Sequence, residues 1–188
     1  MLEARVPALA VASLIKDAML AVGMPDVDAA KCAELMLEAD LVGADAHGVF
    51  RLPQYVLRIK ACGVNPKANI TVEKTAPATA MVDGDNGMGH LVMQRAADTA
   101  IALAKETGVA WVGARRSNHA GAAGVYAAMA LPHDMSASKR WWRTPTTCRS
   151  GAAQRTSSAP TRSPSRCRPG RSRRWCSILP PRLSPTAR

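Results

Sequence analysis

The composition of the chain changes abruptly at Ser136. All 14 Asp and Glu residues lie before that position, and the chain has none from Ser136 to Arg188. Twelve of the 25 Lys and Arg residues precede Ser136 and thirteen follow it, so the first part carries a formal net charge of −2 and the tail +13. The formal net charge of +11 for the whole chain therefore describes the tail alone.

This break limits the part that can fold to about residues 1–135. Before it, acidic and basic residues intermix and apolar residues recur at helical and strand spacing, whereas the tail is rich in Arg, Ser, Pro and Thr. Such a tail cannot bury enough apolar surface to offset the entropy lost on ordering. The sequence predicts one domain over residues 1–135 and a disordered basic tail over residues 136–188.

The first 135 residues show alternating helix and strand patterns. Helical spacing predicts helices over residues 11–22, 27–42 and 90–107, each followed by a glycine that ends it. The segment 45–59 is predicted to be helical in part, with Pro53 breaking or starting a helix. The other predicted elements are strands over 70–73, 79–83 and 109–114, a glycine-rich turn over 83–89, a loop over 115–120 and a helix over 121–131. This order predicts an α/β domain.

Several site types and locations are not indicated. The five cysteines show no CxxC and no regular spacing, so neither a zinc site nor a disulfide framework is expected. No stretch approaches the roughly 20 apolar residues of a membrane span. The N-terminus is not typical of a signal peptide, because Glu3 stands where positive charge is expected and Lys16 and Asp17 end the apolar run. These features predict a cytoplasmic protein without a metal site or membrane contact.

The first group of residues that could carry chemistry is His47, Arg51 and Tyr55. If their segment is helical, their four-residue spacing puts them on one face. Histidine can exchange a proton near neutral pH, and the arginine fork can grip a carboxylate. This combination suits a 2-oxo or 2-hydroxy acid. A helix end with a surface arginine and a half-buried histidine is the simpler alternative, and spacing alone favours it.

The second group is the segment Ser-Asn-His-Ala-Gly-Ala-Ala-Gly at residues 117–124, which follows a predicted buried strand. Small residues at a helix N-terminus let backbone N–H groups approach an anion such as a pyrophosphate. The order is not the G-x-G-x-x-G of a Rossmann fold, and tight helix–strand packing explains the same residues equally well. Gly84, Gly87 and Gly89 are not followed by Lys-Ser/Thr, so a P-loop is excluded and a turn is favoured. His90 and His133 are expected to be structural or exposed.

These motifs, taken together, are Asp-Ala-His-Gly at 45–48, Arg-Leu-Pro at 51–53 with Tyr55, Val-Asp-Gly at 82–84, Gly-Met-Gly at 87–89 and Arg-Ser-Asn-His-Ala-Gly at 116–121. In this order they resemble the malate/L-lactate dehydrogenase family, whose relatives include ureidoglycolate dehydrogenase and diketogulonate reductase. The resemblance covers about residues 6–135. It implies a non-Rossmann α/β fold, a homodimer, and hydride transfer between NAD or NADP and a small 2-oxo or 2-hydroxy acid.

The resemblance also implies a role for each residue. His47 would be catalytic, as the proton donor to the substrate carbonyl, with Arg51 holding the substrate carboxylate and Tyr55 nearby. The cofactor would contact His119, Ala120, Gly121, Ala122 and Ala123, with His119 close to the reacting carbon as a second catalytic residue. The family commonly has Ser before the first His, where this chain has Ala46.

The tail reads as a continuation of the family in a shifted reading frame. Taking the third base of each codon with the first two of the next, the codons from residue 155 to 168 and on permit Asp-Leu-Leu-Gly-Thr-Asn-Pro-Ile-Ala-Val-Ala-Val-Pro-Ala. Those over residues 174–187 permit Val-Val-Leu-Asp-Ile-Ala-Thr-Thr-x-Val-Ser-Tyr-Gly. These strings resemble the next motifs of the family, in order. A frameshift near Met135 would explain the missing acids, the excess of Arg, Pro and Ser, and the abrupt boundary together.

Two functions follow from these features. The first is a dehydrogenase of this family, truncated into an incomplete α/β domain and expected to be inactive in this form. The alternative is a non-enzymatic interaction protein whose basic tail binds nucleic acid through phosphate contacts, with Trp141, Trp142 and Trp175 stacking on bases. The frameshift explains more features of the tail, so nucleic acid is not the expected partner. Neither the particular 2-hydroxy acid nor the choice between NAD and NADP follows from the sequence.

Overall fold

The computed structural model describes residues 6–140 and the backbone of residues 173–179. The α-helices are α1 (Ala8–Ala21), α2 (Asp26–Leu41), α3 (Leu52–Lys60), α4 (Gly89–Thr107) and α5 (Ala123–Ala128). The strands are β1 (Thr71–Ala76), β2 (Thr79–Gly87), β3 (Ala110–Ser117), β4 (Ser136–Arg140) and β5 (Arg173–Leu179). Three short 3-10 helices are η1 (Asp45–His47), η2 (Val49–Arg51) and η3 (Leu131–His133). The predicted α/β architecture is therefore confirmed.

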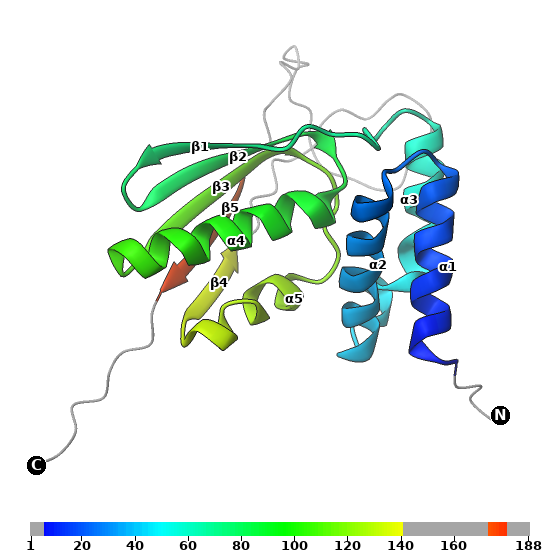
Figure 1. Cartoon of the computed structure of the whole chain (residues 1–188), viewed down its shortest axis with the longest axis horizontal. Helices are drawn as coiled ribbons and strands as arrows, with labels where there is room; N and C mark the ends of the chain where they lie inside the picture. The colour runs from blue at the N-terminus through cyan, green and yellow to red at the C-terminus, as the bar shows by residue number, and fades with distance from the viewer. Residues whose placement is uncertain (1–5, 141–172, 180–188) are drawn as a thin grey trace, which may run out of the picture.

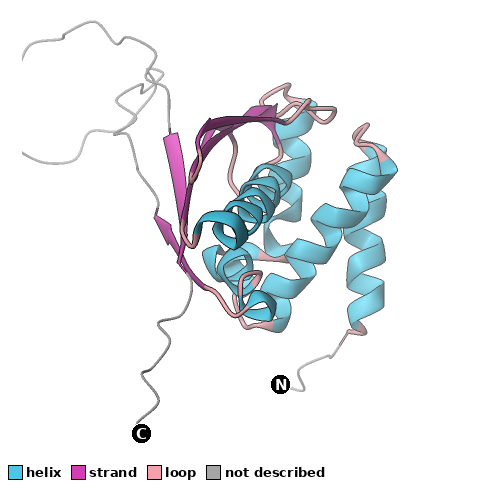
Figure 2. Cartoon of the chain, turned by 60° about the vertical axis from the view of Figure 1, so that its left-hand side comes forward, coloured by secondary structure: helices cyan, strands magenta, loops and turns pink. Residues whose placement is uncertain are grey.

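The strands form one mixed sheet in the order β1-β2-β3-β5-β4. β2 and β3 are parallel and are joined through α4, whereas the other neighbouring strands run antiparallel. Figure 1 shows α4 and α5 against this sheet and α1, α2 and α3 grouped beside them, and Figure 2 shows the helices on one side of the sheet. This arrangement brings the end of β3 near the helical group, where the candidate site forms.

Two clusters of buried apolar residues hold these layers. The first joins β2 and β3 to α4, with Val82 and Val112 of the strands and Val92 and Ala96 of the helix fully buried. The small side chains on this face of α4 let the helix approach the sheet closely. The second cluster lies among α1, α2 and α3 and includes Met88, the residue before α4. Met88 thus ties the helical group to the sheet unit.

The predicted helices at the N-terminus and in the centre are confirmed. α1, α2 and α4 begin and end within a few residues of the predicted ranges. Gly23, Gly43 and Gly108 follow them with positive φ angles, the backbone conformation that ends a helix. Strong apolar periodicity and a terminating glycine were sufficient signals because both act within a single helix.

The prediction of a glycine-rich turn over residues 83–89 is wrong, because most of this segment belongs to strand β2. β2 continues to Gly87, and its register with β3 shifts between Asp83 and Gly87. Asp85 and Asn86 have φ angles of 46° and 57°, which marks a bulge in the strand. The bulge is held by contacts with residues that precede β1, since the Asp85 carboxylate accepts hydrogen bonds from the Asn65 side chain and the Asn69 backbone. These contacts are distant in sequence, so local turn chemistry could not predict them.

Two other predicted boundaries also differ from the structure. β3 extends to Ser117, beyond the predicted end at residue 114, because its partner strands β2 and β5 continue the ladder. The helix predicted over residues 121–131 shortens to Ala123–Ala128 and is followed by η3, which has a proline in its first turn. Proline lacks the N–H that would continue the helical hydrogen bonds.

The structure describes two strands inside the segment predicted to be a disordered tail. β4 and β5 pair with each other, and β5 also pairs with β3. A β-ladder is made by backbone hydrogen bonds, and Ala137 of β4 also packs against the core cluster of the sheet. The rest of the predicted tail, residues 141–172 and 180–188, lies outside the described residues. The domain boundary at residue 135 stays a prediction.

Candidate functional site

Three predicted site residues converge although they come from distant parts of the chain. His47 ends η1, Tyr55 lies on α3, and His119 lies in the loop after β3. The His47 and His119 rings stack with their centroids 5.8 Å apart and their planes 15° apart. The Tyr55 hydroxyl lies 2.7 Å from Nδ1 of His119. Two imidazoles and a phenol thus share one site between the helical group and the sheet.

The segment of His47, Arg51 and Tyr55 is not the single helix that would put them on one face. It consists of η1, η2 and α3, with Gly48 in a non-helical conformation between the first two. The Asp40 carboxylate, from the end of α2, accepts a hydrogen bond of 2.8 Å from the backbone N–H of Val49. This long-range cap fixes the break. The condition for a shared helical face is therefore not met, whereas the prediction of a partly helical segment with a helix starting near Pro53 is confirmed. His47 reaches the site because the chain turns.

Arg51 is half-buried and already contacts two protein oxygens. Its Nε donates to the backbone carbonyl of Ala46 at 2.9 Å, and a terminal nitrogen donates to the Gln54 side chain at 2.7 Å. A guanidinium has five N–H donors, so these two bonds leave capacity for a carboxylate. The bond from Arg51 Nε also fixes the backbone of Ala46, the residue directly before His47.

The loop of residues 118–122 presents the predicted cofactor residues to different degrees. Ala120 and Gly121 are buried, His119 and Ala122 are half-buried, and Ala123 is exposed. The side chain of Ala120 belongs to the core cluster of the sheet, and its carbonyl accepts a hydrogen bond from Tyr126. Contact with a ligand at Ala120 and Gly121 would therefore depend on their backbone groups.

His90 lies at this site as a structural residue. The sequence predicted that it would be either structural or exposed, and the structure agrees with the first. It is 1% exposed, and Tyr55 packs edge-on against it with ring centroids 5.3 Å apart. A Cβ atom at Gly121 would lie 2.7 Å from Nε2 of His90, and Gly121 has a φ of 67°. A larger residue at position 121 would therefore be strained by both the backbone conformation and the His90 ring.

Asn118 is a site residue that sequence reasoning did not single out by itself. Its side-chain nitrogen donates to the carbonyl of Asn86 at 2.8 Å and that of Gly87 at 3.0 Å. Its side-chain oxygen accepts from Arg58 on α3 at 3.1 Å. Asn118 thereby joins the bulge of β2, the end of β3 and α3 immediately beside His119. The only sequence signal was its place in the motif at 116–121.

Asp83 anchors the start of the same bulge through two arginines. Its carboxylate accepts from Nε of Arg115 at 2.8 Å and from Nε of Arg116 at 2.6 Å, and its side chain is 14% exposed. Burial raises the pKa of the Asp83 carboxyl, but hydrogen bonds from the backbone of Asp85 and from both arginines outweigh it, so the net pKa is lowered. Arg116 itself has a φ of 49°.

Replacing Asp83 by Asn is expected to destabilise the fold by about 1–2 kcal/mol at neutral pH, since two charge-assisted hydrogen bonds are weakened. A lowered folded-state pKa adds stability above the unfolded-state pKa, and this stability disappears as the pH falls through the folded value. The free energy of unfolding of the wild type should therefore fall more steeply below about pH 4 than that of Asp83→Asn. Denaturant unfolding at a series of pH values measures this difference.

Asp17 on α1 offers the matched control, because it is exposed. Asp17→Asn should leave the wild-type pH dependence unchanged. Equal pH slopes for the wild type and Asp83→Asn would contradict the role of the Asp83 carboxylate.

Gly89 allows the start of α4 to approach the loop of His119. A Cβ atom at this position would overlap the backbone carbonyl oxygens of Asn118 and His119. We expect Gly89→Ala to cost about 1–3 kcal/mol of stability, because backbone atoms cannot move aside as a flexible side chain can. Gly124→Ala is the control, since a Cβ there meets nothing within 4 Å. Denaturant unfolding of both variants measures the cost, and equal stabilities would contradict the close approach.

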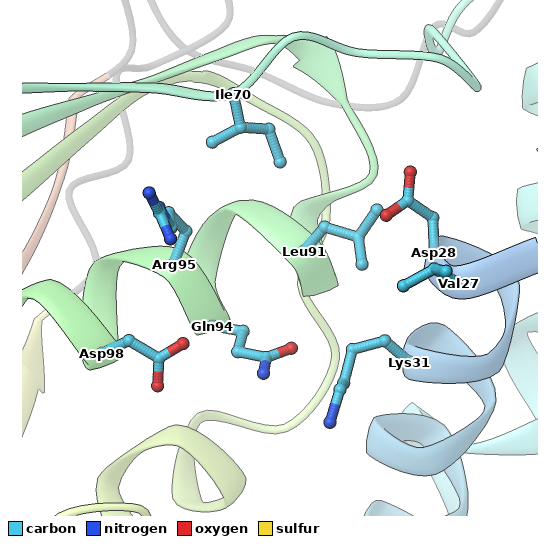
Figure 3. A pocket seen from close by; sticks show the side chains of 8 residues that line it. All are labelled: Val27, Asp28, Lys31, Ile70, Leu91, Gln94, Arg95 and Asp98. Atoms are coloured by element: carbon cyan, nitrogen blue, oxygen red, sulfur yellow. The ribbon is translucent and has the colours of Figure 1, made fainter. Parts of the chain in front are cut away.

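A hollow of about 280 Å³ lies elsewhere, between α2, α4 and the residue before β1. Figure 3 shows its lining side chains, which are Val27, Asp28, Lys31, Ile70, Leu91, Gln94, Arg95 and Asp98. Burial raises the pKa of the Asp28 carboxyl. Burial also raises the pKa of the Asp98 carboxyl, although the positive charges of the nearby Arg95 and Lys31 oppose this shift. None of the predicted site residues lines this hollow, so we place the candidate site at the histidines, where the groups that can exchange protons meet.

No group of three or more His, Cys, Asp or Glu side chains in the described part of the chain could hold a metal ion. No helix described in the structure is both long and apolar enough to cross a membrane.

Comparison with known proteins identifies relatives of the chain. The sequence model of the malate/L-lactate dehydrogenase family matches residues 6–156. The L-sulfolactate dehydrogenase of Methanocaldococcus jannaschii is 43% identical over 122 residues, which are 65% of this chain and 36% of that protein. The ureidoglycolate dehydrogenase (NAD(+)) of Escherichia coli K12 is 34% identical over 109 residues, which are 58% of this chain and 31% of the relative.

The fold is also similar to that of solved relatives. The structure of malate dehydrogenase from Pyrococcus horikoshii superimposes with a TM-score of 0.67 at 42% identity, over 70% of this chain and 38% of the other. The chain thus spans little more than a third of the length of the relatives it matches.

Proposed function

We propose, because this chain belongs to the malate/L-lactate dehydrogenase family, that the whole protein transfers hydride between NAD or NADP and a small 2-hydroxy or 2-oxo acid. The observation that carries this proposal is the stacking of the His47 and His119 rings, 5.8 Å apart, from segments distant in sequence. The substrate class is supported by the relatives, since sulfolactate, malate and ureidoglycolate are all 2-hydroxy acids.

His47 is the group that we assign to proton exchange with the substrate oxygen. It is half-buried, so the protein covers the residue in part and leaves part of it accessible. Imidazole can give or take a proton near neutral pH, as interconversion of a carbonyl and a hydroxyl requires. The stacked His119 ring on one side limits the orientations that His47 can adopt.

Arg51 is the group that we assign to the substrate carboxylate. Its bond to the carbonyl of Ala46 holds the guanidinium near His47, and its bond to Gln54 can be exchanged for one to a ligand. A planar fork that binds a carboxylate beside a proton donor would fix the 2-oxo group relative to the imidazole. Tyr55 is buried, so any role of its side chain toward the substrate would be indirect.

The loop of residues 119–123 fits a flat cofactor ring. Its side chains are small apart from His119, Ala123 is exposed, and a Cβ at Gly124 would enter open space. His119, Ala122 and Ala123 would contact a nicotinamide through accessible atoms, and Ala120 and Gly121 through backbone groups. The nicotinamide, when bound, supplies or accepts the hydride. We also propose the homodimer that the family resemblance implies and the cytoplasmic location that the sequence predicts.

The proposal is tested in the protein whose reading frame is restored after Met135. Oxidation of NADH or NADPH is followed with the 2-oxo counterparts of malate, sulfolactate and ureidoglycolate. We expect Arg51→Ala to raise the substrate KM by about 10- to 100-fold and the cofactor KM far less, since a charged hydrogen bond is lost. Arg95→Ala, in the separate hollow, is the control and should change neither value. Absence of turnover with every acid and both cofactors would refute the proposed function.

A further inference from the structure

We propose that Tyr55 and Gly121 hold His119 as a neutral imidazole whose proton is on Nε2. Two donors converge on the same nitrogen of this ring. The Tyr55 hydroxyl lies 2.7 Å from Nδ1, and the backbone N–H of Gly121 donates to Nδ1 at 3.2 Å. Tyr55 would then be a positioning residue for His119, which differs from the role near the substrate that the family resemblance implies for it.

The backbone contact decides which ring nitrogen carries the proton. An amide N–H can only donate, so Nδ1 must accept and cannot itself carry hydrogen. A neutral imidazole has one protonated and one unprotonated nitrogen, which leaves the proton on Nε2. The contact is built into the loop, because Gly121 follows His119 by two residues and its φ of 67° belongs to the left-handed region.

The Tyr55 hydroxyl reinforces the same tautomer. A phenol can donate or accept, but toward an unprotonated nitrogen it must donate. Its distance of 2.7 Å is that of a well-formed hydrogen bond from a hydroxyl donor, and Tyr55 is only 3% exposed. A proton on Nδ1 would reverse the Tyr55 bond and place two hydrogens between the Gly121 amide and the ring. Both donors therefore favour one tautomer.

The positions of the two donors are fixed by their surroundings. α3, which carries Tyr55, also carries Arg58, and Arg58 donates to the side chain of Asn118 beside His119. Asn118 in turn donates to the carbonyl of Gly87 in β2. The buried His90 ring packs edge-on against Tyr55. Helix α3 and the loop are thus joined at Asn118 and at His119. These two contacts keep the Tyr55 hydroxyl directed at Nδ1 of His119.

The consequence for catalysis rests on the proposed function. If His119 borders the reacting carbon, it acts as a fixed hydrogen-bond donor through Nε2–H. His47 is then the imidazole left to exchange a proton with the substrate. His47 and His119 would then have different tasks although their side chains are chemically identical. The hydrogen bonds made by the ring nitrogens would set the task of each residue.

Nuclear magnetic resonance of the full chain tests the tautomer without substrate or cofactor. The chain has four histidines, and single His→Gln variants assign their ring signals. Long-range proton–nitrogen spectra at neutral pH separate protonated from unprotonated ring nitrogens. We expect Nδ1 of His119 to be unprotonated and Nε2 protonated. A protonated Nδ1 of His119 in the wild type would overturn the proposal.

Tyr55→Phe tests the positioning role. We expect the Nδ1 signal of His119 to shift toward that of a free imidazole and the tautomer preference to weaken. Tyr126→Phe is the matched control, because it also removes a buried hydroxyl bonded to this loop, at the carbonyl of Ala120, but no bond to the imidazole. Unchanged His119 signals in Tyr55→Phe would overturn the role of Tyr55.

A kinetic measurement separates this inference from the proposed function. In the frame-restored protein, Tyr55→Phe should lower kcat about 10-fold while the substrate KM changes less, as expected when a catalytic group is misaligned. A raised KM with unchanged kcat would instead make Tyr55 a substrate ligand and overturn the inference. A protein without turnover can still show the predicted tautomer, so failure of the proposed function is recognised separately.

Discussion

Correcting the proposed frameshift near Met135 is expected to give a protein that reduces a 2-oxo acid with NADH or NADPH, whereas the chain as it stands is expected to show no turnover. The described residues bring His47, Tyr55 and His119 together, but the chain spans only 36% of its L-sulfolactate dehydrogenase relative. Hydride transfer requires donor and acceptor to be held in near-attack geometry, which depends on the complete shell around them. Absorbance of the reduced cofactor measures the difference.

The matched control for this comparison is a chain that ends at Met135. It should be as inactive as the chain as it stands, because neither contains the residues that the restored frame would add. Resequencing the gene around the codons of Met135 and Ser136 tests the frameshift directly. Equal turnover by the original and restored proteins would contradict the expected inactivity of the original chain.

In the restored protein, His47→Ala is expected to lower kcat by about 10²–10⁴-fold, the loss typical of a missing general acid. The substrate KM should change less, since the proposed contact of Arg51 with the carboxylate is kept. Steady-state kinetics with the best 2-oxo acid and cofactor measures both values.

His133→Ala is the control for this prediction. His133 is exposed at the end of η3 and is not one of the predicted site residues, so its replacement should leave kcat unchanged. If His47→Ala keeps the wild-type rate while the restored enzyme is active, the assignment of His47 as proton donor fails. His119 would then be the obvious substitute, and its predicted proton on Nε2 would have to be exchanged during turnover.

Features that depend on neighbouring residues were predictable from the sequence. α1, α2 and α4 follow from apolar periodicity and a terminating glycine, because helical hydrogen bonds and their caps lie within a few residues of each other. The α/β class follows from the order of such elements. The motifs around His47 and His119 identified the family because several short patterns occur in a fixed order, which a single motif could not have done.

Features that depend on pairing between distant segments were decided by the tertiary structure. The bulge in β2 exists because Asp85 is held by Asn65 and Asn69, and the break at Gly48 because Asp40 caps Val49. Strands β4 and β5 pair through backbone hydrogen bonds between segments that are distant in sequence.

The site itself shows the same division. The sequence alone determined which side chains have the chemistry for proton exchange and carboxylate binding, because those properties belong to the residue type. Only the tertiary structure decided that His47 stacks on His119 and that Tyr55, 64 residues earlier in the chain, contacts Nδ1 of the same ring. Such contacts depend on how α3 packs beside the end of β3, and no local pattern contains that information.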